Sequence, residues 1–169
     1  DELEHGDKVL AYLGEPGLTD WTRICLERSD QVVMATTGEA PVGALSPTER
    51  LAAELFPASR RRLVRLHPCR QGVVSGTAGW LARMEVAIHH HVSIEDDADL
   101  LALARFLTGQ AVGFVAGGGG GYGPAHVGIY RAFREQGVTF DAFVGTSVGS
   151  AMLAGFALLG EYDTLTAGT

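Results

Sequence analysis

Apolar and polar positions alternate in short blocks over the first two thirds of this 169-residue chain. Runs that alternate with a period of two, or that are short and continuously apolar, predict strands at residues 8–13, 31–36, 62–67 and 86–92. Runs with helical spacing predict helices at residues 19–27, 47–56, 77–83 and 94–107. Strands and helices that alternate at this spacing are typical of a parallel, right-handed α/β unit.

Two of these helices carry start or stop signals. Ser46-Pro47-Thr48-Glu49 has the form of a helix start, in which Ser46 is the N-cap and Glu49 follows it at the capping-box position. The helix at 94–107 begins with acids and is closed by Thr108-Gly109.

Two glycine-containing turns dominate the last third of the chain. The apolar run 111–116 leads into five consecutive glycines, Gly117 to Gly121, and the run 140–144 leads into Gly145-Thr146-Ser147-Val148-Gly149. A helix is expected after each turn. The second covers residues 147–159, and the first starts near Pro124 with small and apolar residues at helical spacing, namely Ala125, Gly128, Ile129, Ala132 and Phe133.

A sharp turn from strand to helix can lift a serine hydroxyl onto an exposed, strained corner, where helix N-terminal amides favour negative charge. Ser147 is therefore our candidate nucleophile, with Gly145 and Gly149 supplying the bend. In a glycine-rich chain the G-x-S-x-G pattern also arises by chance, and the serine could simply cap its helix.

The glycine run strengthens the catalytic hypothesis. Acyl transfer needs backbone donors facing the forming oxyanion, and Gly118, Gly119 and Gly120 could supply them without side-chain obstruction. A flexible linker is the alternative, but its apolar flanks disfavour it. No histidine follows Ser147, so a Ser-Asp dyad suits the chain better than a triad.

A nucleotide-binding domain is a weaker alternative. Gly118, Gly120 and Gly123 fit G-x-G-x-x-G, but the acid expected at the far end of the next strand is missing, because Asp141 lies at that strand's start. The phosphate-loop signature G-x-x-x-x-G-K-[ST] does not occur in the sequence.

These turns resemble the patatin-like phospholipases, and within them the bacterial relatives of neuropathy target esterase. The similar segments are 115–128 and 145–150, with weaker likeness through Arg62 to Pro68, Gly79 to Leu81, His89 to Val92 and Arg105 to Gly109. The resemblance implies a glycine-rich oxyanion hole at Gly118, Gly119 and Gly120, and a Ser147 nucleophile acylated by a phospholipid, a lysophospholipid or another ester. It implies no metal or organic cofactor.

Two departures from the family pattern stand out. The family has G-G-G-G-x-R-G where this chain has Tyr122 at the arginine position. The family's general base comes from an Asp-Gly motif after the serine, and no Asp-Gly dipeptide follows Ser147. Glu161 and Asp163 are the acids after it, and we interpret both as exposed turn residues. We therefore expect this chain alone to be inactive, and an inactive lipid-binding or regulatory module is the alternative function.

Composition limits the classes of binding partner and the cellular location that we expect. A net charge of −7 argues against nucleic acid. We interpret the basic cluster Arg60-Arg61-Arg62, with Arg65 nearby, as the solvated start of a strand, with an anionic lipid contact as the alternative. Cys25 and Cys69 lack C-x-x-C spacing, which favours a cytoplasmic location, with peripheral contact to a membrane as a further option.

Two further observations concern ligands and membranes. In a strand, only His89 and His91 of His89-His90-His91 could share a metal ion, and no third ligand is evident. The uncharged stretches 106–130 and 142–160 approach a membrane span in length, but their glycines favour a buried strand and helix.

The predicted fold class is thus α/β, a parallel sheet with flanking helices. We expect an N-terminal α/β unit at residues 1–110, followed at 111–169 by the first part of a truncated patatin-like hydrolase domain.

Overall fold

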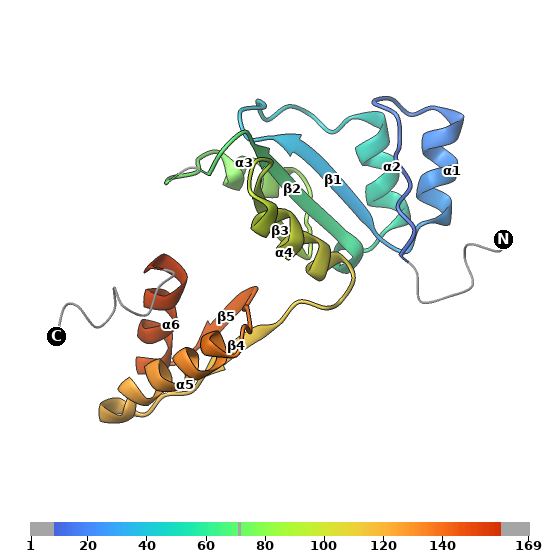
Figure 1. The fold of residues 1–169 in the computed structure, drawn as a ribbon. Helices are drawn as coiled ribbons and strands as arrows, with labels where there is room; N and C mark the ends of the chain where they lie inside the picture. Colours follow the sequence, from blue (N-terminus) through green and yellow to red (C-terminus); the bar gives the residue numbers. More distant parts are fainter. Residues whose placement is uncertain (1–8, 71, 160–169) are drawn as a thin grey trace. The chain divides into compact units, whose positions relative to one another are not determined.

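The computed structural model describes residues 9–70 and 72–159. By its contacts the chain divides into two compact units, Asp1–Leu103 and Ala104–Thr169, which are treated separately below. Both units are α/β, with parallel strands and flanking helices, as the sequence predicted (Figure 1).

Unit 1 is built on a three-stranded parallel sheet in the order β1-β2-β3. The register pairs Thr36 of β1 with Arg65 of β2, and Arg65 with His91 of β3. The elements of unit 1 are α1 (Asp20–Arg28), β1 (Val32–Thr37), α2 (Pro47–Leu55), η1 (Ala58–Arg60), β2 (Arg61–His67), α3 (Thr77–Arg83), β3 (Ile88–Ser93) and α4 (Asp97–Leu107). The last of these helices, α4, continues past the boundary with unit 2.

The predicted start of α2 is confirmed. The Ser46 hydroxyl accepts a hydrogen bond from the Glu49 amide at 3.2 Å, and the Glu49 carboxylate accepts one from the Ser46 amide at 2.7 Å. This reciprocal pair satisfies two backbone donors that a helix N-terminus otherwise leaves free.

The predicted strand at 8–13 is wrong for its described part, because residues 9–13 form no regular element. Val9, Leu10 and Leu13 are exposed, and the carbonyl of Leu13 accepts a hydrogen bond from the Trp21 indole at 3.0 Å. Without a neighbouring strand to pair its backbone, the apolar alternation of this segment does not produce a strand.

The interpretation of Arg65 as solvated is also wrong, since its side chain is only 2% exposed. Leu63, Arg65 and His67 alternate along β2 and share one face of the sheet. The next layer on that face includes α3, which carries Trp80 over the same surface. Burial of Arg65 was not visible in the sequence because it depends on which face α3 covers.

Unit 2 contains β4 (Gly113–Ala116), η2 (Gly120–Tyr122), α5 (Pro124–Glu135), β5 (Ala142–Gly145) and α6 (Val148–Leu159). The two strands pair in parallel, with Ala116 opposite Gly145. Aromatic rings form the core of this unit, and the Tyr130 and Phe156 rings stack with their centroids 4.2 Å apart.

The helix expected to start near Pro124 is confirmed as α5, although the residues whose spacing predicted it, Ala125, Gly128, Ile129, Ala132 and Phe133, are all exposed. The helix instead turns Tyr130 and Val127 toward the core. The Tyr130 ring stacks on Phe156, and Phe133 contacts the rings of Phe114 and Phe140 from the edge of the core.

The boundary between the units falls inside α4, so Arg105 near the end of that helix belongs to unit 2. The division at residue 110 inferred from the sequence stays a prediction. In the part of the chain that the structure describes, no helix is both long and apolar enough to cross a membrane.

Candidate active site

Ser147 lies at the carboxyl end of β5, between the strand and α6. Its φ of 53° is the one positive value among the described non-glycine residues, and the residue is exposed. A left-handed conformation at a residue with a Cβ costs on the order of 1–3 kcal/mol and persists only where the surroundings impose it. The chain thus holds the serine on a strained, accessible corner.

The two glycines that flank this corner allow its backbone to pack closely. A Cβ on Gly145 would lie 2.6 Å from the Ser150 amide nitrogen, inside the first turn of α6. A Cβ on Gly149 would collide with the carbonyl oxygens of Ala116 and Gly117. Both obstacles are backbone atoms, which have no rotamer with which to move away.

The glycine run lies beside the serine. Because Ala116 pairs with Gly145, both turns leave the same edge of the two-stranded sheet, and the Thr146 amide donates to the Ala116 carbonyl at 3.1 Å. A Cβ built on Gly118 would stand 3.3 Å from Ser147 Cβ and 3.9 Å from its Oγ. The structure therefore brings Gly118 against Ser147.

The other two residues of the predicted oxyanion hole follow directly. A Cβ built on Gly119 would lie 3.7 Å from Tyr122 Cβ. Gly120 has φ of 53°, which favours glycine, and it starts the short helix η2. Tyr122, at the position of the family arginine, is 84% exposed.

Two supporting contacts were not expected from the sequence. His126 Nε2 lies 3.0 Å from the Gly117 carbonyl oxygen, to which it can donate, so α5 anchors the start of the glycine run. No local signal in the sequence marks this bond, which joins residues nine positions apart.

The second contact fixes the starts of both strands. Asp141, with its side chain 1% exposed, accepts hydrogen bonds from Arg105 at 2.6–3.1 Å and from the Val112 amide at 3.0 Å. The hydrogen bond from Arg105, together with that from Val112, outweighs burial and lowers the pKa of the Asp141 carboxyl. Asp141 is thus a structural acid on the side of the strands away from Ser147.

Two further predictions concern the acids after Ser147 and a metal site at the histidines. Glu161 and Asp163 lie outside the described residues. In residues 9–70 and 72–159, no group of three or more His, Cys, Asp or Glu side chains is placed to hold a metal ion. The His91 ring instead hydrogen-bonds His67 at 3.0 Å.

Comparison with known protein families identifies the first unit. A model described as the Neuropathy Target Esterase family P-loop like domain matches residues 1–110. The chain belongs to the neuropathy target esterase family. Its P-loop-like domain lacks the phosphate-loop signature, and its one lysine, Lys8, lies outside the described residues.

Relatives in the family extend the similarity into the second unit. A patatin-like phospholipase domain-containing protein of Caenorhabditis elegans is 31% identical over 78% of this chain and 13% of its own length. A neuropathy target esterase of Drosophila virilis is 31% identical over 89% and 12%, and a lysophospholipase of Yarrowia lipolytica is 27% identical over 96% and 15%. The chain thus spans less than a sixth of the length of these relatives. No solved structure gave a significant match.

Proposed function

We propose that residues 111–169 carry the nucleophile and oxyanion loop of a serine lipid acyl hydrolase, whose complete form includes further residues. The contact between the strained Ser147 corner and Gly118 is the observation that supports it most. The names of two relatives, an esterase and a lysophospholipase, support a carboxylic-ester substrate.

In the proposed reaction, Ser147 Oγ attacks the acyl carbonyl of a phospholipid, lysophospholipid or simpler ester. Its proton passes to a carboxylate, and amides of Gly118, Gly119 and Gly120 stabilise the negative oxygen of the tetrahedral intermediate. The alcohol then leaves with a proton, and water releases the acid from the acyl-serine. The general base is an aspartate of an Asp-Gly motif that these 169 residues do not contain.

The test uses the full-length protein and a fluorophosphonate, which labels activated serines. We expect the label on the peptide that contains Ser147, and we expect Ser147→Ala to abolish both labelling and ester turnover. Ser150→Ala is the matched control, since this exposed serine lies one turn away and its hydroxyl is held by the Ser147 carbonyl at 2.6 Å. Labelling that persists in Ser147→Ala would exclude the assignment.

Tyr122 favours a second candidate, an inactive lipid-binding module. An exposed ring replaces the guanidinium that the family pattern places next to the oxyanion loop. In that case the full-length protein bearing Tyr122→Arg would gain labelling that the wild type lacks. Closeness to bacterial family members stays a prediction, since the relatives named above belong to Caenorhabditis, Drosophila and Yarrowia.

A further inference from the structure

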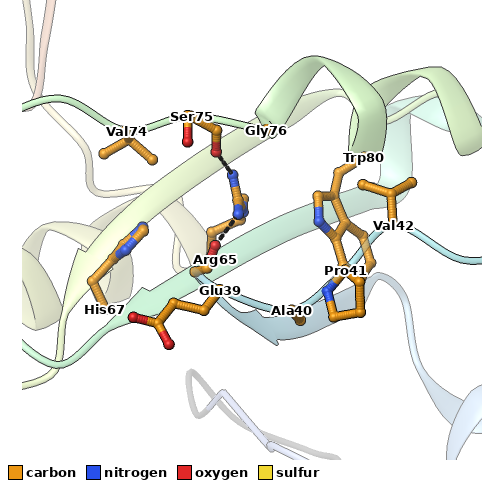
Figure 2. A pocket seen from close by; sticks show the side chains of 11 residues that line it. Glu39, Ala40, Pro41, Val42, Arg65, His67, Val74, Ser75, Gly76 and Trp80 are labelled. Atoms are coloured by element: carbon orange, nitrogen blue, oxygen red, sulfur yellow. Dashed lines mark hydrogen bonds between the residues drawn. The ribbon is translucent and has the colours of Figure 1, made fainter.

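A pocket of about 380 Å³ opens in unit 1, where β1 and β2 end. Its lining comes from the loop after β1, the end of β2, the loop before α3, and α3 itself (Figure 2), namely Gly38, Glu39, Ala40, Pro41, Val42, Arg65, His67, Val74, Ser75, Gly76 and Trp80. The carboxyl ends of parallel strands are where α/β sheets bind ligands, and this volume lies within the usual range for small-molecule sites.

The floor of this pocket carries a buried positive charge. The Arg65 guanidinium donates to the Ser75 carbonyl at 2.7 Å, to Thr77 Oγ1 at 3.0 Å and to the Gly38 carbonyl. All three acceptors are neutral, and among the described residues no carboxylate contacts Arg65. Buried charges in proteins are ordinarily matched by an opposite charge.

Two donors in the lining also lack an acceptor. Arg65 Nε and Trp80 Nε1 are both buried and have no hydrogen-bond partner in the described part of the chain. Neither nitrogen can accept a hydrogen bond, so only an acceptor could satisfy them. An oxyanion in the pocket would match the charge of Arg65.

A hydrogen-bond chain connects Arg65 with His67 on the pocket wall. Thr77 Oγ1 accepts from Arg65 and also lies within hydrogen-bond distance of His91 Nε2, at 3.1 Å. The other ring nitrogen of His91, Nδ1, shares a hydrogen bond with His67 Nε2 at 3.0 Å. Burial, followed by electrostatic interaction with His67 and Arg65, lowers the pKa of His91 and so favours its neutral form. The Nδ1 atom of His67 lies against Gly38.

The rest of the lining limits and shapes the ligand. Glu39, the carboxylate of the lining, is exposed and weakens the attraction for an anion. Pro41, Val42 and Trp80 form an apolar wall on one side of the pocket (Figure 2). An organic group attached to the anion could pack against this wall.

We propose that this pocket binds a phosphate oxyanion, with Arg65 and His67 facing its oxygens. The site is distinct from the Ser147 site and does not depend on the proposed hydrolase function. It also differs from a phosphate loop, because its charge comes from an arginine on the second strand and not from a lysine after the first.

The first test is calorimetric titration of the 169-residue chain with inorganic phosphate, glycerol 3-phosphate and ADP, each without magnesium. We expect saturable binding with a Kd of about 1 mM or tighter for at least one of them. Tighter binding of glycerol 3-phosphate or ADP than of inorganic phosphate would indicate that the organic group packs against the apolar wall. Tighter binding of inorganic phosphate would indicate that the pocket binds the free anion. Absence of saturable binding for all three would overturn the proposal.

Val74 and Val73 provide a matched pair that avoids the folding risk of replacing Arg65. Val74 lines the pocket, whereas Val73 is 86% exposed and is not among the lining residues. Val74→Glu should weaken phosphate binding at least about tenfold by like-charge repulsion. Val73→Glu should leave it nearly unchanged, and Glu39→Gln should tighten it. Equal effects of Val73→Glu and Val74→Glu would show that the pocket is not the binding site.

Discussion

Gly149 is the residue at which the two turns of the candidate active site come closest. A Cβ built on Gly149 would lie within 2.5 Å of the carbonyl oxygens of both Ala116 and Gly117. The G-x-S-x-G pattern therefore has a steric reason at this position that is independent of any chemistry. A larger residue would push α6, and with it Ser147, away from the glycine run.

Gly149→Ala should accordingly destabilise the protein by about 1–3 kcal/mol, because backbone atoms must move to admit the methyl group. Gly128→Ala is the control, since Gly128 lies in α5 with open space around it and alanine favours helices by roughly 0.5–1 kcal/mol. Urea unfolding of the two variants should give changes of opposite sign. Equal stability of Gly149→Ala and the wild type would mean that the turns pack less closely than the structure shows.

At the scale of elements, the Asp141 carboxylate organises the start of both strands of unit 2. Asp141 directly precedes β5, and its carboxylate binds Arg105 at the end of α4 and the Val112 amide just before β4. The glycine run and the serine corner lie at the opposite ends of these strands. The register that brings Gly118 to Ser147 therefore rests in part on this ion pair.

The lowered pKa of Asp141 gives a pH signature. A depressed native pKa stabilises the fold above the unfolded value, near 3.8, and this contribution is lost as the pH falls toward the native value. Asp141→Asn should thus lower the free energy of unfolding at neutral pH, and its difference from the wild type should shrink below pH 3.8. Asp30→Asn, at an exposed position, should stay close to the wild type at neutral pH. A difference that is constant from pH 7 to pH 3 would contradict the argument.

At the scale of the whole molecule, the chain joins two α/β units of different character. Unit 1 carries the family's P-loop-like match and a polar pocket, whereas unit 2 has an aromatic core and the serine corner. Within unit 2, Val115 and Val144 are register partners, and both are exposed, at 73% and 61%. Parallel sheets are normally covered on both faces, so the exposure of these two valines sets this face of unit 2 apart.

The position of Arg105 predicts which fragment of unit 2 is the more stable. A fragment of residues 104–169 keeps the Arg105–Asp141 pair, and a fragment of residues 111–169 loses it. The longer fragment should unfold at a higher urea concentration, and Asp141→Asn should reduce that advantage. If both fragments unfold at the same concentration, the pair contributes nothing to the stability of the unit.

The sequence by itself determined the order of the elements from residue 19 onward, the capping box of α2 and the two glycine turns. These features depend on neighbours within a few residues, through helical periodicity, side-chain capping and the conformational freedom of glycine. The bounds of α3, predicted at 77–83, agree with the structure for the same reason.

The tertiary structure alone decided the burial of Arg65, the face of α5 that packs on Phe156, and the absence of a strand at 9–13. It also decided that Gly118 lies against Ser147, residues that are far apart in sequence. Each of these depends on which surface another element covers or which strand pairs with which. Contacts of that kind join residues distant in the chain, and local patterns carry no record of them.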